Sequence, residues 1–472
     1  MPRRTKIVCT LGPSSSSPEK IGELMRAGMD VARINFSHGD LESHGRTIRS
    51  VREVATHLGR PVAVLGDLQG PKIRVGSLPE PIVLRAGQDV VFAPEGQHTA
   101  YEIPTTYPEL ASDLDAGDLV LLADGLMELL VLESAPPRVA MRVIHGGMLT
   151  SNKGINLPGI RMSVPSLTPK DFRDLEFALE QNIDYIALSF VREPEDVLDL
   201  KRRIPAGGPP VVVKIEKGIA LDNLEPIMDV ASAVMVARGD LGVELPFEQV
   251  PLAQKRMIQL ANLSSRPVIT ATQMLESMIE NPRPTRAEAS DVANAIIDGT
   301  DAVMLSAETA TGRFPVQAVR AMVRIAEEIE ASSLLETGPH YDTPVEPLAA
   351  RAMLTEWAIA AATVEAVRRL SAPLILTFTR TGFTARVVSS FRPPVPILAL
   401  TDSSRTYNQL ALVWGVIPVL CPEGCSYDEM LACARQTAFG RGFAEPGQRV
   451  VLTAGLPVHT SNKTNTLRVL QL

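Results

Sequence analysis

The sequence lacks long apolar runs and basic tracts. No apolar run approaches the roughly 18 residues that a membrane-spanning helix needs, and the N-terminal segment leads into a strand-like run instead of a signal peptide. The chain has 46 lysines and arginines against 54 aspartates and glutamates, a formal net charge of −8. This balance argues against a nucleic-acid partner. We therefore expect a cytoplasmic protein that binds neither membrane nor nucleic acid.

Cysteine is also scarce, with four in 472 residues. None forms a C-x-x-C pair, and a zinc site made from Cys421, Cys425 and Cys433 would need a fourth ligand that the neighbouring sequence does not offer. Cys9 falls in a predicted buried strand. We expect reduced thiols with structural roles.

Aromatic residues make up only 4% of the chain, whereas 45% of its residues are hydrophobic and the mean hydropathy is +0.10. This composition is typical of a globular α/β protein and not of a disordered one. At roughly 150 residues per domain, the length indicates about three domains.

Eight short apolar runs with strand character alternate with helix-like segments. They cover residues 6–11, 31–36, 62–65, 185–189, 211–215, 233–237, 268–272 and 302–305. Eight is the number of strands that closes a (β/α)₈ TIM barrel. An open doubly wound sheet is the alternative. We favour the barrel because ionisable or hydroxyl residues follow nearly every run, and a closed ring brings them to one face.

Two further regions differ from this alternation. Residues 71–166 contain short apolar runs separated by turns and no convincing long helix, which predicts a small β-barrel domain inserted into the first one. A polar, proline-bearing linker at 331–346 precedes a helix-like run at 349–370 and strand-like runs at 374–378, 397–400, 416–420 and 449–453. We therefore expect a barrel at 1–70 and 167–335, an insert at 71–166 and a C-terminal α/β domain at 345–472.

Chemistry in such barrels is located at the carboxyl ends of the strands. The residues expected there are Arg33, Asn35, Ser37, His38, Asp67, Arg74, Lys214, Glu216, Arg238, Gly239, Asp240, Thr272, Gln273, Ser306 and Glu308. One lysine and two carboxylates, Lys214, Glu216 and Asp240, suffice to hold Mg²⁺ beside a developing negative charge. With the arginines, they suit a small substrate that carries phosphate and carboxylate groups. The expected reaction is phosphoryl transfer or enolate chemistry.

Seven collinear motifs resemble the pyruvate kinase family. They are R-I-N-F-S-H-G (33–39), G-P-K-I-R (70–74), K-I-E (214–216), M-V-A-R-G-D-L-G-V-E (235–244), A-T-Q-M-L-E-S-M (271–278), N-P-R-P-T-R-A-E (281–288) and M-L-S-A-E-T-A (304–310). The resemblance runs essentially from end to end. It implies an enzyme that transfers the phosphoryl group of phosphoenolpyruvate to ADP and yields pyruvate and ATP.

The resemblance also implies roles for individual residues. Glu216 and Asp240 match the ligands of Mg²⁺ (or Mn²⁺), and Lys214 matches the lysine that stabilises the phosphoryl group and the enolate oxygen. Arg33 and Arg74 match phosphate-binding arginines. The backbone N–H groups around Gly239 and Asp240 match the site for the substrate carboxylate, which makes sense if a short helix begins at Leu241. Thr272 matches the hydroxyl beside the enolate carbon, with Ser306 and Glu308 behind it for proton delivery. For Lys214, the alternative is a surface salt bridge to Glu216.

Nucleotide contacts are implied for Asn35, Phe36, Ser37, His38, Arg74 and Lys153. Since Lys153 belongs to the insert, we expect the insert to act as a lid over ADP. A rigid appended domain is the alternative.

One departure from the family concerns monovalent cations. Most members have a glutamate that supports a K⁺ ion held by residues matching Asn35, Ser37, Asp67 and Leu68, whereas this chain has Lys72 at that position. A lysine ammonium supplies the charge of K⁺ and would repel a second cation. We expect activity without K⁺.

The C-terminal domain offers a candidate effector loop at 377–386, with Thr379, Arg380, Thr381, Gly382 and Thr384 able to surround a phosphate. The resemblance implies a sugar-phosphate or AMP effector and a homotetramer. Phe383 stands where some members have a basic residue, and a plain polar loop is the alternative. The rival functions for the whole chain are a barrel lyase or aldolase that uses no nucleotide, and a non-catalytic sugar-phosphate sensor.

Overall fold

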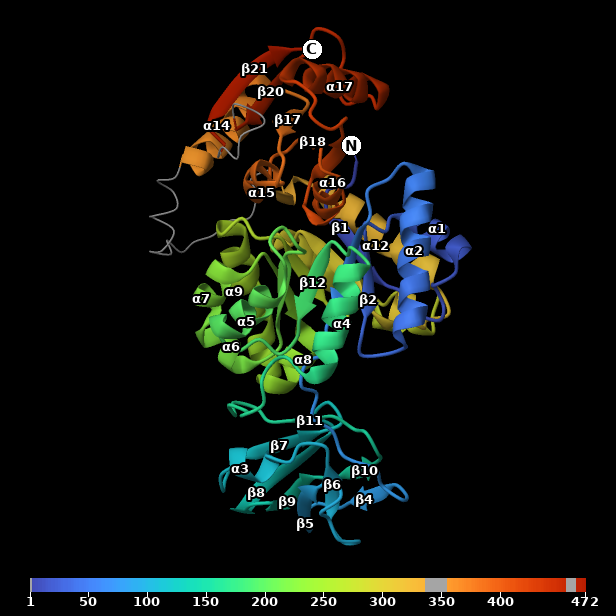
Figure 1. Ribbon diagram of the computed structural model, residues 1–472, viewed down its shortest axis with the longest axis vertical. Helices are drawn as coiled ribbons and strands as arrows, with labels where there is room; N and C mark the ends of the chain where they lie inside the picture. The colour runs from blue at the N-terminus through green and yellow to red at the C-terminus, as the bar shows by residue number, and fades with distance from the viewer. Residues whose placement is uncertain (1, 336–354, 456–463) are drawn as a thin grey trace.

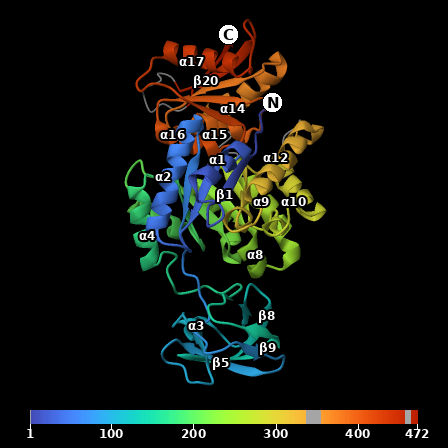
Figure 2. The same cartoon turned by 90° about the vertical axis from the view of Figure 1, so that its right-hand side faces the viewer.

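The computed structural model describes residues 2–335, 355–455 and 464–472. The molecule is elongated, with the insert at one end, the barrel in the middle and the C-terminal domain at the other end (Figure 1). A view turned by 90° shows the same succession (Figure 2). No helix in the described ranges combines the length and apolarity needed to cross a membrane.

Eight parallel strands close the central barrel in the order β1-β16-β15-β14-β13-β12-β3-β2. They are β1 (Lys6–Thr10), β2 (Val31–Asn35), β3 (Ala63–Asp67), β12 (Tyr185–Leu188), β13 (Val211–Ile215), β14 (Ala233–Ala237), β15 (Val268–Ala271) and β16 (Ala302–Leu305). The predicted barrel is confirmed, and the alternative of an open sheet is wrong. Each strand lies within two residues of its predicted bounds at either end.

Helices cover the outside of the barrel. They are α1 (Pro18–Ala27), α2 (Leu41–Leu58), α4 (Pro169–Glu180), α5 (Pro194–Arg203), α6 (Gly218–Asp222), α7 (Leu224–Val230), α8 (Arg238–Glu244), α9 (Val250–Leu263), α10 (Arg286–Ile297), α11 (Ala307–Ala310) and α12 (Pro315–Ala331). Short 3₁₀ turns follow at η1 (Phe247–Gln249), η2 (Glu276–Ile279) and η3 (Ser333–Leu335). Helix starts follow local rules: Thr168 and Asp171 form a capping box before α4, with Pro169 in the first turn.

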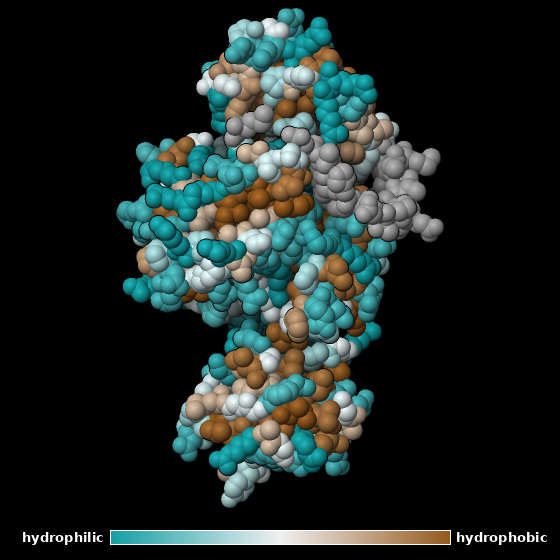
Figure 3. Space-filling model, turned by 180° about the vertical axis from the view of Figure 1, so that it is seen from behind, coloured by the Kyte–Doolittle hydropathy of each residue, from teal (hydrophilic) through white to brown (hydrophobic). Residues whose placement is uncertain are grey.

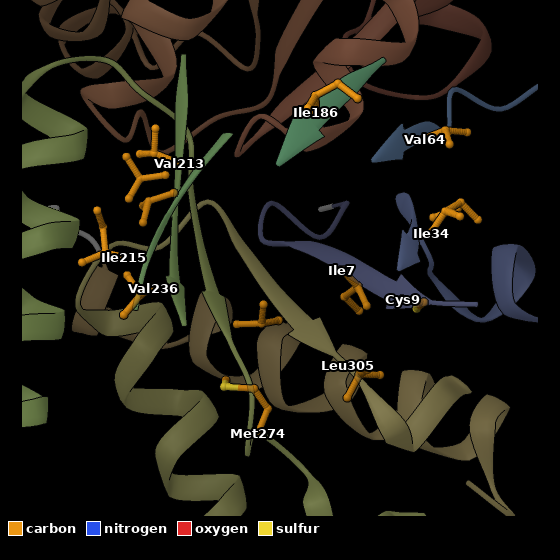
Figure 4. Close-up of a cluster of buried hydrophobic side chains, with 14 of the residues drawn as sticks. Ile7, Cys9, Ile34, Val64, Ile186, Val213, Ile215, Val236, Met274 and Leu305 are labelled. Carbon is orange, nitrogen blue, oxygen red and sulfur yellow. The ribbon is translucent and has the colours of Figure 1, made fainter. Parts of the chain in front are cut away.

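The barrel has two apolar cores because side chains alternate along each strand. Outward-facing residues such as Val213, Ile215 and Val236 pack between strands and helices (Figure 4). Inward-facing residues fill the barrel and are joined there by Ala411 and Leu412 of the C-terminal domain. The C-terminal domain therefore closes the inner core at the amino ends of the strands, opposite the face expected to carry chemistry.

The insert is composed almost entirely of strands, as predicted. A six-stranded sheet has the order β11-β7-β8-β9-β5-β6, and β10 pairs with β4 separately. The strands are β4 (Ile82–Leu84), β5 (Asp89–Pro94), β6 (Ile103–Thr105), β7 (Leu119–Leu122), β8 (Met127–Ala135), β9 (Arg138–His145), β10 (Gly147–Leu149) and β11 (Ile155–Asn156), with a short helix α3 (Leu110–Asp113). Residues 74 and 75 link the two edges of the six-stranded sheet, because Val75 pairs with Thr105 of β6 and Arg74 pairs with Gly154 beside β11. This pairing agrees with the predicted small β-barrel.

Two backbone segments that lie side by side connect the insert to the barrel. The N–H of Val75 donates to the carbonyl of Lys153, the N–H of Asn152 donates to that of Val75, and the N–H of Ile155 donates to that of Ile73. A narrow waist separates the two bodies at this connection (Figure 3).

The C-terminal domain is a five-stranded sheet with the order β19-β18-β17-β20-β21. Its elements are α14 (Thr355–Leu370), β17 (Ile375–Phe378), α15 (Phe383–Ser390), β18 (Ile397–Thr401), α16 (Ser404–Gln409), η4 (Leu410–Leu412), β19 (Val416–Leu420), α17 (Tyr427–Gly440), β20 (Arg449–Ala454) and β21 (Thr466–Gln471). The antiparallel β21 was not among the predicted strands. The predicted linker begins at the last residue of α12, and most of it, with residues 349–354 of the predicted helix, lies outside the described residues.

Candidate active site

Three barrel strands carry ionisable side chains at inward-facing positions near their carboxyl ends. Arg33 lies in β2, Asp67 ends β3 and Lys214 lies in β13. The residue two positions before each of them belongs to the apolar core inside the barrel. Alternation along the strand therefore directs all three side chains toward the barrel axis.

Lys214 joins the acidic residues of two strands. Its Nζ lies 2.8 Å from Oε1 of Glu216 and 3.3 Å from Oδ1 of Asp67, and it donates to Oγ of Ser189 at 2.8 Å. Arg33 contacts the other oxygen of Asp67, with Nη2 and Nε both 2.7 Å from Oδ2. The Lys214 side chain is 12% exposed and that of Glu216 1%. Their pair is buried, so the alternative of a surface salt bridge is wrong.

The electrostatics of this cluster keep Lys214 charged. Burial alone would lower its pKa, but the carboxylates of Asp67 and Glu216 outweigh burial and raise it. Burial would raise the pKa of Asp67, yet Lys214 and Arg33 hold it below its usual range. Burial does raise the pKa of Glu216, which Lys214 lowers and the neighbouring Asp240 carboxylate raises further. The cluster therefore neutralises Asp67 but leaves Glu216 short of positive charge.

Asp240 reaches this region from the first turn of α8. The helix begins at Arg238, three residues before the Leu241 start expected from sequence, so Gly239 and Asp240 are inside it. The N–H of Gly239 donates to Oγ1 of Thr272 at 2.7 Å, which fastens α8 to the end of β15. Thr272 has φ 66°, a left-handed conformation that is costly for a β-branched residue. The hydrogen bonds of its hydroxyl to the Gly239 N–H and the Ala271 carbonyl hold this conformation in place.

These residues border an open cleft of about 690 Å³. Its lining includes Asp240, Thr272, Ser306 and Glu308 from the barrel, Lys72 from the connection and Asp124 from the insert. Burial raises the pKa of Glu308. The Oγ of Ser306 is buried and has no hydrogen-bond partner in the part of the chain that the structure describes.

The donor set fits a hard divalent cation. Glu216 and Asp240 are close enough for Asp240 to raise the pKa of Glu216, and two adjacent carboxylates favour a cation between them. No group of three or more His, Cys, Asp or Glu side chains in the described ranges is arranged as a metal site. A cation held by these two side chains would therefore complete its coordination with substrate and water oxygens, as Mg²⁺ commonly does.

Several groups expected to bind a monovalent cation already have hydrogen-bond or ion-pair partners within the protein. Both oxygens of Asp67 contact cations of the chain, Leu68 is buried and its carbonyl accepts from Ser189, and Oδ1 of Asn35 accepts from the N–H of Ser37. Lys72 is exposed and lies on the cleft.

The expected nucleotide segment, residues 35–38, forms the turn after β2. His38 is exposed, whereas the ring of Phe36 is only 1% exposed and packs edge-on against Phe177 and His44. The carbonyl of Phe36 accepts from Nζ of Lys170 at 2.6 Å. The Phe36 side chain is therefore part of the core. The side chains of this turn that a nucleotide could reach are those of Asn35, Ser37 and His38.

Arg74 and Lys153 lie on the two connecting segments of the insert. Nη1 of Arg74 donates to the carbonyl of Asn152 at 2.9 Å, and the Lys153 side chain is exposed. Within the described residues, no hydrogen bond or ion pair joins either side chain to the Lys214 cluster. The insert reaches the cleft elsewhere: a Cβ placed on Gly125 would lie 3.7 Å from Cγ1 of Val243 in α8.

The candidate effector loop follows β17 and precedes α15. Arg380 and Thr381 are exposed, Thr379 is buried, and Gly382 has φ 76°. Thr384 is buried and its hydroxyl lies 2.7 Å from that of Thr464.

Two contributors to the cluster were missed by the motifs. Ser189 bridges Lys214 and the carbonyl of Leu68, and the N–H of Phe190 donates to Oε2 of Glu216 at 2.8 Å. Ser189 ends a predicted strand, so the rule that hydroxyl residues follow barrel strands could have found it. Phe190 has φ 55°, which no sequence signal indicates.

A closed (β/α)₈ barrel with a buried lysine and paired carboxylates at the carboxyl ends of its strands defines a barrel enzyme that acts on an anionic substrate. Two family models match the chain: "Pyruvate kinase, barrel domain" over residues 2–319 and "Pyruvate kinase, alpha/beta domain" over residues 357–470. The chain belongs to the pyruvate kinase family and is a phosphotransferase.

Several curated relatives match nearly the whole chain. A pyruvate kinase of Geobacillus stearothermophilus is 44% identical over 476 residues, which cover 99% of this chain and 80% of the relative. "Pyruvate kinase 2" of a Synechocystis species is 45% identical, with 99% and 79% covered. A pyruvate kinase of Agrobacterium vitis is 43% identical, with 99% and 98% covered. These matches disfavour both the nucleotide-independent lyase and the non-catalytic sensor.

Proposed function

We propose that this enzyme transfers the phosphoryl group of phosphoenolpyruvate to ADP, with Mg²⁺ or Mn²⁺, and releases pyruvate and ATP. The observation that carries the proposal is the buried Lys214, which lies between Asp67 and Glu216 while Asp240 and Thr272 line the adjacent cleft. The family membership and the relatives' names support the same reaction.

Lys214 and Arg33 supply fixed positive charge where the substrate loses its phosphoryl group. The phosphoryl oxygens and the enolate oxygen both carry negative charge in this reaction, and groups already oriented toward them stabilise the transition state without reorganising. Asp67 fixes the orientation of both cations, because each of its oxygens contacts one of them.

Glu216 and Asp240 would hold the divalent cation. When bound, it would act as a Lewis acid that neutralises charge on phosphoryl, carboxylate and enolate oxygens. The N–H of Phe190 keeps one oxygen of Glu216 in place, and α8 carries Asp240 to the cleft.

Protonation of the enolate carbon completes the reaction. Thr272 accepts from Gly239, and its hydroxyl lies 2.7 Å from the carbonyl of Ala271, to which it donates. The Ser306 hydroxyl lines the same cleft and has no partner among the described residues, so it is the donor that remains available. We therefore infer that Thr272 positions the substrate and that the proton arrives by way of Ser306, with Glu308 beside it.

We propose that ADP binds between the barrel and the insert, near Asn35, Ser37, His38, Arg74 and Lys153. The paired segments that carry Arg74 and Lys153 are the connection about which the insert would close as a lid. The exposed Arg380 and Thr381 support an effector phosphate at the loop after β17. We also propose a homotetramer and a cytoplasmic location, as the family resemblance and the sequence imply.

We further propose that the enzyme does not need K⁺. The carboxylate of Asp67, which the resemblance assigns to the K⁺ site, is already neutralised by Lys214 and Arg33, and Lys72 adds a further positive charge at the cleft. Replacing K⁺ with a tetraalkylammonium ion should change kcat by less than about twofold, because no charge is missing. Lys72→Glu should create a K⁺ requirement, whereas Lys20→Glu on the outer helix α1 should not. A strong K⁺ requirement of the unmodified enzyme would contradict this proposal.

The reaction itself is tested by a spectrophotometric assay that couples pyruvate formation to lactate dehydrogenase. We expect NADH oxidation that depends on phosphoenolpyruvate, ADP and Mg²⁺ together. Pyruvate formation at the same rate without ADP would instead identify a lyase or phosphatase.

A further inference from the structure

A second buried ion pair lies directly behind the two expected metal ligands. Nζ of Lys217 is 2.5 Å from Oε1 of Glu244, and their side chains are only 5% and 2% exposed. Lys217 follows Glu216 in the chain, and Glu244 follows Asp240 by four residues in α8. Lys217 is therefore connected through the backbone to the expected ligand Glu216, and Glu244 to the expected ligand Asp240.

The geometry of a helix makes this link short. Residues four apart lie on the same face of a helix, one turn from each other, so Glu244 lies one turn behind Asp240. On the other side, a single peptide bond separates Lys217 from Glu216. The ion pair thus joins the chain just after β13 to α8. It lies one residue from Glu216 and one helical turn from Asp240.

Close packing supports the same junction. A Cβ placed on Gly218, the first residue of α6, would lie 3.4 Å from Cδ2 of Leu245 and 3.9 Å from the carbonyl oxygen of Glu244. The end of α8 therefore packs against the start of α6, next to Lys217. Figure 1 shows both helices at the end of the barrel that faces the insert.

A helix of seven residues does not fix its own direction, because short helices depend on tertiary contacts. The bond from Gly239 to Thr272 holds the first turn of α8 against β15. The Lys217–Glu244 pair holds its last turn against the end of β13. Two attachments, one at each end, set where α8 carries Asp240.

We propose that Lys217 and Glu244 are positioning residues that set the separation of the Glu216 and Asp240 carboxylates and thereby the affinity for the divalent cation. The inference rests on the proposed function, since it concerns the same metal site. It assigns neither residue a contact with substrate or metal.

The decisive variant replaces the pair by apolar side chains of similar size, Lys217→Met with Glu244→Leu. Such replacements commonly preserve folding, because neither partner is left as an unpaired buried charge. Mn²⁺ binding by the folded protein without substrate is measured directly from the electron paramagnetic resonance signal of free Mn²⁺. We expect the Kd for Mn²⁺ to rise by about tenfold or more, the range seen when groups that orient metal ligands are removed.

Two control variants distinguish an effect on ligand position from a general loss of stability and from the loss of a charge. Arg52→Met removes the partner of a buried carboxylate, Asp184, just before β12 at the opposite end of the barrel, and should leave Mn²⁺ binding unchanged. Glu244→Gln keeps an acceptor for Lys217 but removes the charge, and should stay within about threefold of the unmodified protein, because the hydrogen bond is retained.

The outcomes are distinct. A folded double variant that binds Mn²⁺ within twofold of the unmodified protein overturns the proposal. So does a Glu244→Gln variant as weak as the double variant, since charge and not position would then matter. If the double variant does not fold, Glu244→Asp, which shortens the side chain by one methylene, is measured against the same threshold. Failure of the unmodified enzyme in the coupled assay would refute the proposed reaction. The Mn²⁺ binding measurements would still test whether Lys217 and Glu244 set the affinity for the divalent cation.

Discussion

Replacing Lys214 with methionine should abolish most of the activity of the enzyme. The change keeps an unbranched apolar side chain in place of the aliphatic part of lysine and removes the ammonium group, which contacts Glu216 at 2.8 Å, Ser189 at 2.8 Å and Asp67 at 3.3 Å. If Lys214 stabilises charge that develops in the transition state, its loss should lower kcat by about 10²–10³-fold, or roughly 3–4 kcal/mol.

The same substitution has a calculable effect on stability. Removing one partner of a buried ion pair costs about 3–5 kcal/mol. The lower end applies here, because Asp67 keeps both contacts with Arg33, and the N–H of Phe190 still donates to Glu216. We therefore expect the Lys214→Met protein to remain folded but to unfold at a lower temperature, and added Mn²⁺ to recover part of the loss by neutralising Glu216.

The assay is steady-state kinetics at saturating substrates and Mg²⁺, combined with thermal unfolding monitored by circular dichroism. Arg52→Met serves as the control, since it disturbs a buried carboxylate at the other end of the barrel. A folded Lys214→Met variant with near-normal kcat would remove Lys214 from the mechanism.

Two further substitutions test other parts of the structure. Burial, partly opposed by Asp30, lowers the pKa of Lys6 to about 8. Folding therefore disfavours its charged form, and the free energy of unfolding of the unmodified protein relative to Lys6→Met should rise by up to about 3 kcal/mol from pH 8 to 10.5. Denaturant titrations across this range check the sign, and a difference that is flat or falls with pH would refute it. Thr272→Val removes the acceptor of the Gly239 N–H but keeps a β-branched side chain, and it should lower the free energy of unfolding by about 1–2 kcal/mol relative to the unmodified protein; equal stability in the same titrations would mean that the bond contributes nothing.

The barrel was predictable because each of its strands is marked locally. A short β-branched run followed by a polar residue suffices to locate β13 and β14, and counting such runs gives the number of strands. The ionisable residues at the ends of these runs follow from the same pattern. Lys214 and Glu216 were identified in this way, and alternation along β13 explains why Lys214 faces the barrel axis.

Features that depend on several distant segments were not predictable. The contact between Lys217 and Glu244 joins residues 27 positions apart, and neither position is unusual in the sequence. The sequence predicts a helix start at Leu241, where a helix N-terminus would face the substrate carboxylate, whereas α8 begins at Arg238. The bond from the Gly239 N–H to Thr272, which holds this first turn, joins two distant segments and has no sequence signal.

The order in which the strands of the insert pair could not be derived from the sequence. Alternating apolar residues locate β8 and β9, but the pattern does not encode which strands become neighbours or that residues 74 and 75 bridge the sheet edges. The edge strand β21 was missed at the other end of the chain, where residues 466–471 mix polar and apolar side chains on both faces.

The central claim is that Glu216 and Asp240 hold one divalent cation beside Lys214. The most direct test is a crystal structure of the enzyme with Mn²⁺ and oxalate, a planar dianion that resembles the enolate of pyruvate, with Mn²⁺ located by anomalous scattering. We predict a single strong peak within bonding distance of both carboxylates and oxalate in contact with Mn²⁺ and Lys214. A peak bound elsewhere, or a well-occupied oxalate away from Lys214, would contradict the account.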